Sequence, residues 1–496
     1  MIRAPALLCG LTLMSLLTLE KPAWPQDVSK FSIMISIILR PAAEPSPALK
    51  YRLLPERHSL VPGNAAVFYH RAIEMLLDKA AAQRQQLDPE KSIATEEQAS
   101  GPWINGPLEA IPLDQAREWL DVYQNALVEV SLGARRQICN WEFDLRSEGT
   151  ELLLPEIQHM RSLIRLAALK VRIAIRARKI DEAIDWLQTG YAMARHVSEG
   201  PILLQGLVGI SMSAVMTRPL EDLIQAPGVP SLYWALANRP RPFVDLAEAI
   251  DGERFLLERE LPSLRELDGP PWSVEKARAF GEELRTKLFR LSGYAARSST
   301  GSNAAPFHEW TSKLGLAALV AQAYPEAKLA LSAQGTPAAQ VEAMPALQVT
   351  ALHTMRSYQE LRDNVFKWTC IPYHQAHQRL DESSLIHKVG GQPNPMLRMF
   401  TLLIPAVRSV QMAQLRVDRR LDVMQCIEGI RIYGAAHGKF PSALNDITEA
   451  PVPLDVATGQ PFEFRVDGDH AILSAPSPRG TDIPQYRITY DLKWAR

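Results

Sequence analysis

The spacing of apolar residues is the feature that most constrains this fold. From Leu113 onward, apolar side chains recur every three or four residues, which is the period of one face of an α-helix. The chain also holds 37 prolines, many of which fall between these periodic stretches and would end a helix. The sequence therefore predicts a mainly α fold, either a multi-helix bundle or an irregular α-solenoid, with a small C-terminal α+β module.

Composition and charge are those of an ordinary globular protein. Apolar residues make up 47% of the 496 residues, and the formal net charge is −1. Such a balance gives no global field toward nucleic acid, so we expect no nucleic-acid partner. The four cysteines are too few for a disulfide scaffold. Whether Cys139, Cys370 and Cys426 form a disulfide stays open at this point.

The first residues resemble an export signal. Arg3 precedes an uncharged run over residues 4–19, which Glu20 and Lys21 end. This is the length of a signal-peptide apolar region and is shorter than a membrane span. We therefore expect export to the periplasm or cell envelope, with residues 1–25 as the signal peptide. A cleaved signal and an uncleaved anchor both remain open. No later segment reaches the roughly 20 apolar residues that a spanning helix needs.

Turn-rich segments divide the remaining chain. Residues 31–39 are rich in β-branched side chains and predict a strand, with residues 48–54 as a weaker partner strand. Residues 292–306 are rich in Ser, Ala, Gly and Asn, which is typical of a linker. The predicted parts are a helical domain with short N-terminal strands at 26–291, the linker at 292–306, a helical continuation at 307–395, and a long helix plus a small antiparallel sheet at 396–496.

A basic stripe lies on the helix expected over residues 154–178. At about 100° per residue, its cationic positions fall within roughly 60° of one another, opposite a wide apolar face. The stripe has two interpretations, a solvated outer face or a docking surface for an anionic partner. Its residues are Arg161, Arg165, Arg172, Arg176 and Lys179.

The next predicted helix looks like the second helix of a tetratricopeptide repeat. Ala183, Leu187 and Gly190 stand where that repeat has small, large and small residues. The resemblance covers one partial unit and implies an α-hairpin, the building block of a helical repeat. It does not imply peptide binding.

The C-terminal segment is similar to the head of type II secretion pseudopilins, which combines a long helix, an aromatic-proline turn and a small sheet. The resemblance covers roughly residues 400–480 and rests on Tyr433, Gly438, Phe440, Pro441, Leu444, Asp455, Gly459, Pro461 and Phe462. Pseudopilins carry this head near the start of the chain, behind a membrane anchor. Here it stands near the end, which favours a reused head-like module. Gly438 is expected at the end of the long helix with a positive φ.

The whole chain also resembles a set of uncharacterised large exported bacterial proteins. The resemblance rests on Tyr51-Arg52-Leu53-Leu54-Pro55, Pro62-Gly63-Asn64-Ala65-Ala66, Cys139-Asn140-Trp141, and Leu361-Arg362-Asp363 followed by Lys367-Trp368. It implies no function.

No motif with a known catalytic mechanism is present. The chain lacks a nucleophile elbow, a phosphate-binding loop and a zinc-protease motif. Cys370, His374 and His377 are close enough in sequence for a metal, but Pro372 interrupts them, and a structural role is favoured. Cys139 is expected to be a buried structural thiol. We therefore predict no catalytic, cofactor-binding or metal-binding residue, and no cofactor.

These observations favour a non-enzymatic exported scaffold or protein-interaction protein of the bacterial envelope, with an unidentified protein partner. One alternative is a hydrolase with an unrecognised active site, which a pocket of convergent polar groups would favour. A second alternative is an accessory component of a pseudopilin-dependent secretion system.

Overall fold

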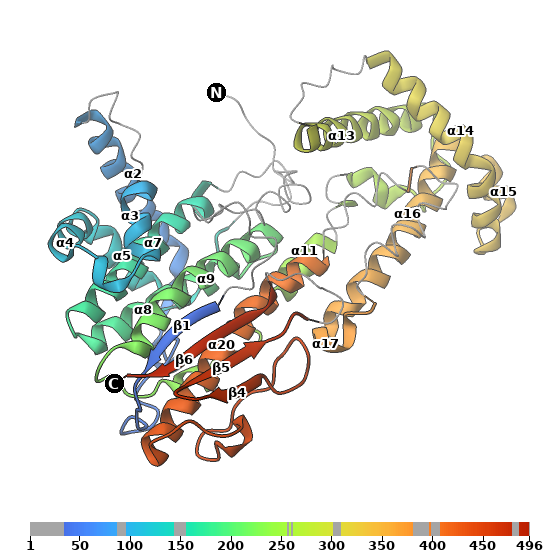
Figure 1. The fold of residues 1–496 in the computed structure, drawn as a ribbon. Helices are drawn as coiled ribbons and strands as arrows, with labels where there is room; N and C mark the ends of the chain where they lie inside the picture. The colour runs from blue at the N-terminus through green and yellow to red at the C-terminus, as the bar shows by residue number, and fades with distance from the viewer. Residues whose placement is uncertain are drawn as a thin grey trace. The chain divides into compact units, whose positions relative to one another are not determined.

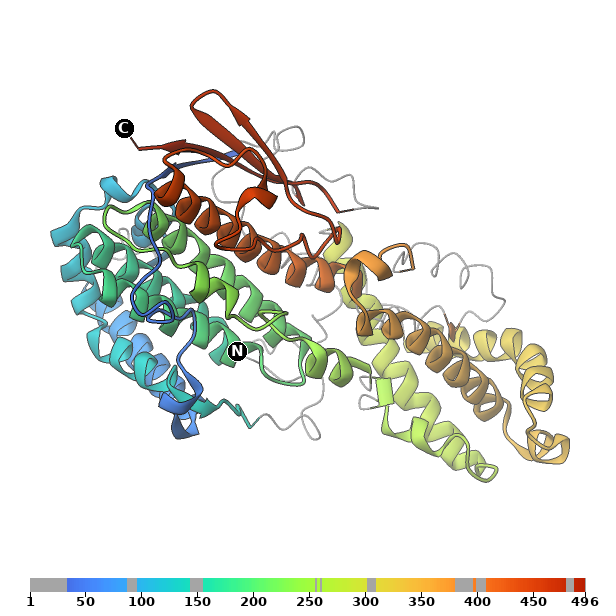
Figure 2. The same cartoon turned by 90° about the horizontal axis from the view of Figure 1, so that it is seen from below.

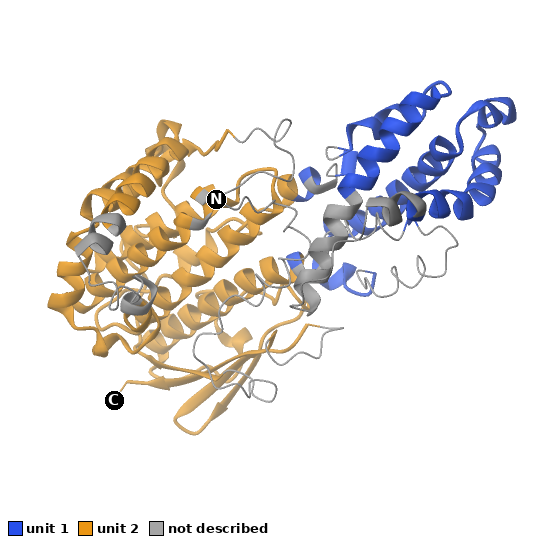
Figure 3. Ribbon diagram, turned by 90° about the horizontal axis from the view of Figure 1, so that it is seen from above, with its two compact units in different colours: residues 1–24, 143–153, 250–410 blue, residues 25–142, 154–249, 411–496 orange. Residues whose placement is uncertain are grey.

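The computed structural model describes residues 34–86, 96–142, 155–254, 257–258, 261–300, 309–379, 396–397, 407–478 and 486–495. The predicted signal peptide therefore lies outside the described residues. The chain divides into two compact units, which are coloured separately in Figure 3. Unit 1 comprises residues 1–24, 143–153 and 250–410, and unit 2 comprises residues 25–142, 154–249 and 411–496.

The mainly α prediction is confirmed, and a small sheet accompanies the helices (Figure 1). The helices that lie in unit 2 are α2 (Ala65–Gln86), α3 (Glu96–Asn105), α4 (Leu113–Asp121), α5 (Gln124–Gly133), α7 (Pro155–Arg176), α8 (Ile180–Ser198), α9 (Leu203–Gln225), α10 (Tyr233–Ala237) and nearly all of α20 (Val407–His437). Short 3-10 turns η2 (Arg57–Ser59), η3 (Leu108–Ala110) and η7 (Leu444–Asp446) join them.

The sheet combines both ends of the described chain. Its strand order is β1 (Met34–Leu39), β6 (Ile488–Trp494), β5 (His470–Ala475) and β4 (Glu463–Asp467). β1 runs parallel to β6, with Met34 opposite Thr489 and Leu39 opposite Trp494, and the other pairs are antiparallel. The expected pairing of residues 31–39 with residues 48–54 is wrong, because residues 48–54 form no strand. A separate parallel pair joins β2 (Val61–Asn64) to β3 (Arg136–Ile138).

The two faces of strand β1 differ in burial, as the alternation of side chains along a strand allows. Ile37 and Leu39 of β1 are 1% and 0% exposed, whereas Met34 and Ile38 are 59% and 52% exposed. Tyr490 and Leu492 of β6 are fully buried. Figure 2 shows α20 beneath this sheet and beside α9. The buried side chains of β1 therefore lie in the same sheet as the buried side chains of its C-terminal neighbour β6.

Helix α8 packs against both α7 and α9. Small residues allow the close approach of α8 and α9. A Cβ atom at Gly209 would lie 2.6 Å from the carbonyl oxygen of Ala194, and one at Gly190 would lie 2.5 Å from the side chain of Met216. Because the Ala194 oxygen belongs to backbone, a larger residue at Gly209 would force the two helices apart.

Buried ion pairs connect α20 to its surroundings. Arg419 donates from Nε and Nη2 to the two carboxylate oxygens of Asp455, at 2.8 and 2.7 Å. Arg420 and the Tyr490 hydroxyl both donate to Glu221 Oε1 on α9, at 2.8 and 2.6 Å. At the end of α20, Gly438 has a φ of +70°, which confirms the expected glycine cap.

Unit 1 has a core of its own. Its elements include α11 (Ala247–Arg254, which begins in unit 2), η5 (Pro262–Glu266), α13 (Val274–Thr300), α14 (Glu309–Ala333), α15 (Ala338–Ala343), α16 (Ala346–Phe366), η6 (Lys367–Cys370) and α17 (Tyr373–Ala376). Trp272, Phe280 and Tyr358 are among the side chains that pack together there. Residues 292–300 of the expected linker continue helix α13, and residues 301–308 lie outside the described residues.

Within the described ranges, every helix is too short or too polar to cross a membrane.

We expect Arg419→Met to lower the free energy of unfolding by about 3–5 kcal/mol, because it leaves the fully buried Asp455 carboxylate without its counter-charge. Chemical denaturation of the full chain measures this loss. Arg117→Met is the control, since Arg117 and Asp114 form an exposed pair at 3.7 Å whose loss should cost less than about 1 kcal/mol. Equal losses in the two variants would contradict the structural role of the Arg419 pair.

Candidate functional site

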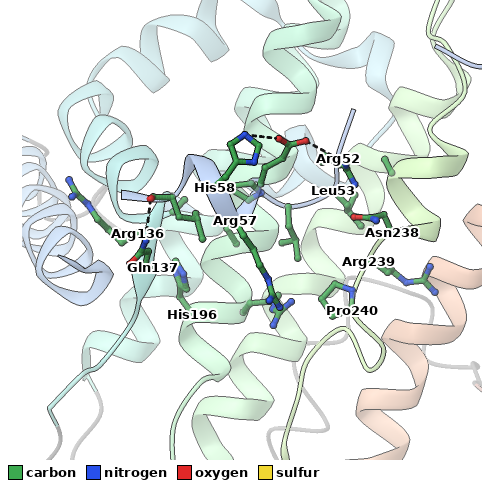
Figure 4. Close-up of a pocket in the computed structure, with 18 of the residues that line it drawn as sticks. Arg52, Leu53, Arg57, His58, Arg136, Gln137, His196, Asn238, Arg239 and Pro240 are labelled. Atoms are coloured by element: carbon green, nitrogen blue, oxygen red, sulfur yellow. Dashed lines mark hydrogen bonds and ion pairs between the residues drawn. The ribbon is translucent and has the colours of Figure 1, made fainter. Parts of the chain in front are cut away.

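A polar pocket of about 990 Å³ lies in unit 2 (Figure 4). The segment around η2 forms one wall, and α8 and the start of β3 contribute others. The turn after α10 completes the lining. Its residues are Arg52, Leu53, Leu54, Pro55, Glu56, Arg57, His58, Leu60, Ala134, Arg136, Gln137, Ala192, Arg195, His196, Glu199, Ala235, Asn238, Arg239 and Pro240.

Arginine dominates the charge of this lining. Five arginines face two glutamates, Glu56 and Glu199, among the lining residues. The arginines are Arg52, Arg57, Arg136, Arg195 and Arg239. The lining therefore carries an excess of positive charge even when both of its histidines are neutral.

Three of these guanidinium groups already contact neighbouring groups through ion pairs, a hydrogen bond or an aromatic ring. Arg52 Nε pairs with Glu56 Oε1 at 3.2 Å. Arg136 stacks over the ring of Phe68, 4.2 Å from its centroid, and donates to the carbonyl oxygen of Pro62 at 3.2 Å. Arg239 turns toward α20 in Figure 4 and forms a buried ion pair with Asp422. These contacts fix the walls of the pocket.

The positive charges of Arg57 and Arg195 are less completely neutralised by neighbouring carboxylates. Arg57 has no ion pair within the part of the chain that the structure describes, and Figure 4 shows its side chain extending into the pocket. Arg195 Nη2 lies 3.9 Å from Glu199 Oε1. Burial lowers the pKa of Arg195, whereas the charges of Glu199 and Asp245 raise it, and the charge of Arg57 makes a smaller contribution that lowers it. The half-buried Arg195 guanidinium and the exposed Arg57 guanidinium therefore repel each other, and an incoming anion would relieve this repulsion.

His196 is a buried titratable group of the lining, with 8% of its surface exposed. Its Nδ1 lies 2.8 Å from the hydroxyl of Tyr69, which is fully buried on α2. Burial lowers the pKa of His196 to about 4, and the charge of Arg195 acts in the same direction. His196 is therefore neutral near pH 7.

Cys139 interacts electrostatically with Tyr69 and is a free thiol, as are Cys370 and Cys426. Burial raises the pKa of the Cys139 thiol, and the charge of Glu199 raises it further. A thiol that keeps its proton near neutral pH is a poor nucleophile.

The predicted basic stripe does not form one continuous outer face. Arg172 is fully buried, and its Nε donates to Asp222 Oδ2 at 2.7 Å. Its other nitrogens donate to the carbonyl oxygens of Trp103, Ile104 and Gly106. The Arg172 guanidinium therefore joins α7 to α9 and to the end of α3 and is closed to a partner.

The other stripe residues differ in exposure. Arg176 is half-buried and donates to the carbonyl oxygens of Leu108 and Glu109 at 2.9 and 2.8 Å. Arg161 and Arg165 are also half-buried, and the exposed Lys179 pairs with Glu182 at 3.2 Å. Binding of an anionic partner by these four residues stays a prediction.

Cys370, His374 and His377 converge on no metal site. Cys370 is exposed, and His377 Nδ1 lies 3.0 Å from the carbonyl oxygen of His374. Among the residues with described positions, no cluster of Cys, His, Asp or Glu has the geometry of a metal site.

Sequence reasoning missed the pocket. Arg57, His196 and Arg239 are far apart in the chain and match no motif. The only signal was indirect: the run from Tyr51 to Pro55, on which the resemblance to exported proteins rests, lies partly in the pocket wall. A long-range convergence of this kind leaves no local pattern in one sequence.

We expect His196 to make stability depend on pH. Its pKa is lower in the folded chain, about 4, than its ordinary value of 6.5, so the unfolded chain binds this proton more readily. Above pH 6.5 this group does not reduce the free energy of unfolding. As the pH drops toward 4, its protonation in the unfolded chain lowers that free energy by about 3 kcal/mol in total. Denaturation of the wild type and His196→Gln at pH 7 and pH 4.5 measures the difference. Parallel losses in the two proteins would contradict the assignment.

The chain was compared with protein-family models, with curated proteins and with solved structures, and none of the three comparisons gives a match.

Proposed function

We propose that this protein is an exported, non-enzymatic interaction protein of the bacterial envelope, and that its unit 2 binds an acidic segment of a protein partner in the arginine-rich pocket. The observation that carries the proposal is the Arg57 side chain. It extends into the pocket without an ion pair in the described residues, beside the incompletely paired Arg195.

The size of the pocket agrees with this proposal. Ligand sites commonly measure roughly 300–1,000 Å³, and this pocket, at about 990 Å³, lies at the upper end. Such a volume accommodates a few side chains of a peptide segment. Arginine is also the cation best suited to a carboxylate, because its planar fork can donate two parallel hydrogen bonds.

The chemistry of the lining favours binding over catalysis. A general base must accept a proton near the working pH, and the low pKa of His196 makes it a weak base at pH 7. The neighbouring Cys139 thiol stays protonated because burial raises its pKa. Neither group supports a hydrolase mechanism in this state.

Export is the part of the proposal that rests on the sequence alone. The uncharged residues 4–19, bounded by Arg3 and Glu20, support it. Expression of the full chain in a bacterial host, followed by fractionation, tests this part. Recovery in the periplasm or with the envelope is expected, and recovery only in the cytoplasm would contradict export.

We expect a hexaglutamate peptide to bind the full chain at low ionic strength, and Arg57→Ala to weaken this binding about tenfold. Isothermal titration calorimetry measures both affinities. Because Arg57 is exposed and has no ion pair in the described residues, its removal should leave the thermal unfolding temperature unchanged.

Arg117→Ala is the matched control, since it removes one exposed arginine outside the pocket lining. Its hexaglutamate affinity should equal that of the wild type. Equal weakening by Arg57→Ala and Arg117→Ala, or equally strong binding of hexalysine, would overturn the proposed function.

A further inference from the structure

The hydrogen bond between Tyr69 and His196 determines which ring nitrogen of His196 carries the proton. The Tyr69 hydroxyl oxygen and His196 Nδ1 lie 2.8 Å apart, and either atom could be the donor. In the first arrangement Tyr69 donates to Nδ1, and in the second Nδ1–H donates to Tyr69. The two arrangements differ in what they leave unsatisfied.

Burial decides between them. Tyr69 is fully buried, and His196 Nδ1 is the only hydrogen-bond partner of its hydroxyl among the residues that the structure describes. If Nδ1–H were the donor, the hydroxyl proton of Tyr69 would be buried without an acceptor, which is costly. The Tyr69 hydroxyl therefore donates the hydrogen bond, and Nδ1 accepts it. A neutral His196 then carries its own proton on Nε2.

The side chain of Trp141 contacts both members of this pair, Tyr69 through its ring and His196 through its backbone. The rings of Tyr69 and Trp141 stack with centroids 6.0 Å apart, and Trp141 Nε1 donates to the backbone carbonyl oxygen of His196 at 3.4 Å. His196 itself lines the pocket. Because Nδ1 already accepts a hydrogen bond from Tyr69, Nε2–H is the ring group that remains available to donate to a ligand in the pocket.

We infer that His196 Nε2–H and the guanidinium groups of Arg57 and Arg195 form a binding site for an oxyanion, either a carboxylate or a phosphate group, and that Tyr69 is the positioning residue that keeps His196 in the donating tautomer. The inference rests on the proposed function, because it assigns the atoms that would bind the acidic ligand. All three binding groups donate hydrogen bonds, which matches a ligand group that only accepts them.

This site would bind anions without protonation of its histidine. The charged groups around it are Arg57, Arg195 and Glu199. Asp245, just before α11, acts on both Arg195 and Glu199, and Glu248 in the first turn of α11 acts on Glu199. Because the donor is a neutral Nε2–H, raising the pH from 6 to 8 should leave binding through His196 unchanged. A site that used a protonated histidine would lose affinity over the same interval.

Nitrogen-15 NMR of the full chain with labelled histidine tests the tautomer at pH 7, with His196→Gln to assign the signal. We expect a protonated Nε2 and an unprotonated Nδ1 in the wild type, and a shift toward protonated Nδ1 in Tyr69→Phe. Tyr191→Phe is the matched control, because Tyr191 is another fully buried tyrosine and lies on α8 outside the pocket lining. A protonated Nδ1 in the wild type would overturn the role of Tyr69.

Titration with inorganic phosphate and, separately, with hexaglutamate tests the oxyanion site. We expect at least one of them to shift the Nε2 signal of His196, and Tyr69→Phe to weaken that binding about tenfold while Tyr191→Phe does not. A response to phosphate alone identifies a phosphate ligand, and a response to hexaglutamate identifies carboxylates. If neither moves the signal, the oxyanion site is overturned.

The two proposals fail in different ways. If hexaglutamate binds in an Arg57-dependent manner and the His196 signal stays unmoved, the inference fails and the proposed function stands. If phosphate moves the His196 signal and hexaglutamate does not bind, the oxyanion site stands and the acidic-peptide function fails.

Discussion

The buried charges of α20 are the interactions on which unit 2 depends. Arg431 donates to the carbonyl oxygen of Arg40 after β1 at 3.0 Å, Arg420 pairs with Glu221 on α9, and Arg419 holds Asp455 before the sheet. One helix thus connects the beginning, the middle and the end of the described chain. A buried charge is stable only beside its partner, so each pair penalises any other packing of these segments.

The same helix fixes one wall of the candidate site. Asp422 of α20 binds Arg239, which lies in the turn that lines the pocket. This ion pair makes the charge of Arg239 unavailable to a ligand. Among the described residues, the charges of Arg57 and Arg195 are not paired with a carboxylate of α20. The electrostatic character of the pocket therefore follows from which arginines already have buried carboxylates and which do not.

The stripe on α7 shows where a helical wheel succeeds and where it fails. The period correctly placed Arg172 and Arg176 on one face of one helix. It could not show that this face is covered at Arg172 by the end of α3 and by Asp222 of α9. A charged residue in sequence is expected at the surface, because burial without a partner is expensive. The partner of Arg172 is 50 residues away and leaves no signal beside it.

The sequence by itself determined the mainly α class, the strands of the C-terminal segment and the glycine cap at Gly438, because helical period, strand alternation and capping are local properties of a few neighbouring residues. The tertiary structure decided that β1 joins β6, that Arg172 is buried, and that Arg57, Arg195 and His196 line one pocket. These features depend on contacts between distant segments, whose free energy comes from burial and charge pairing in the folded chain. No local pattern encodes them.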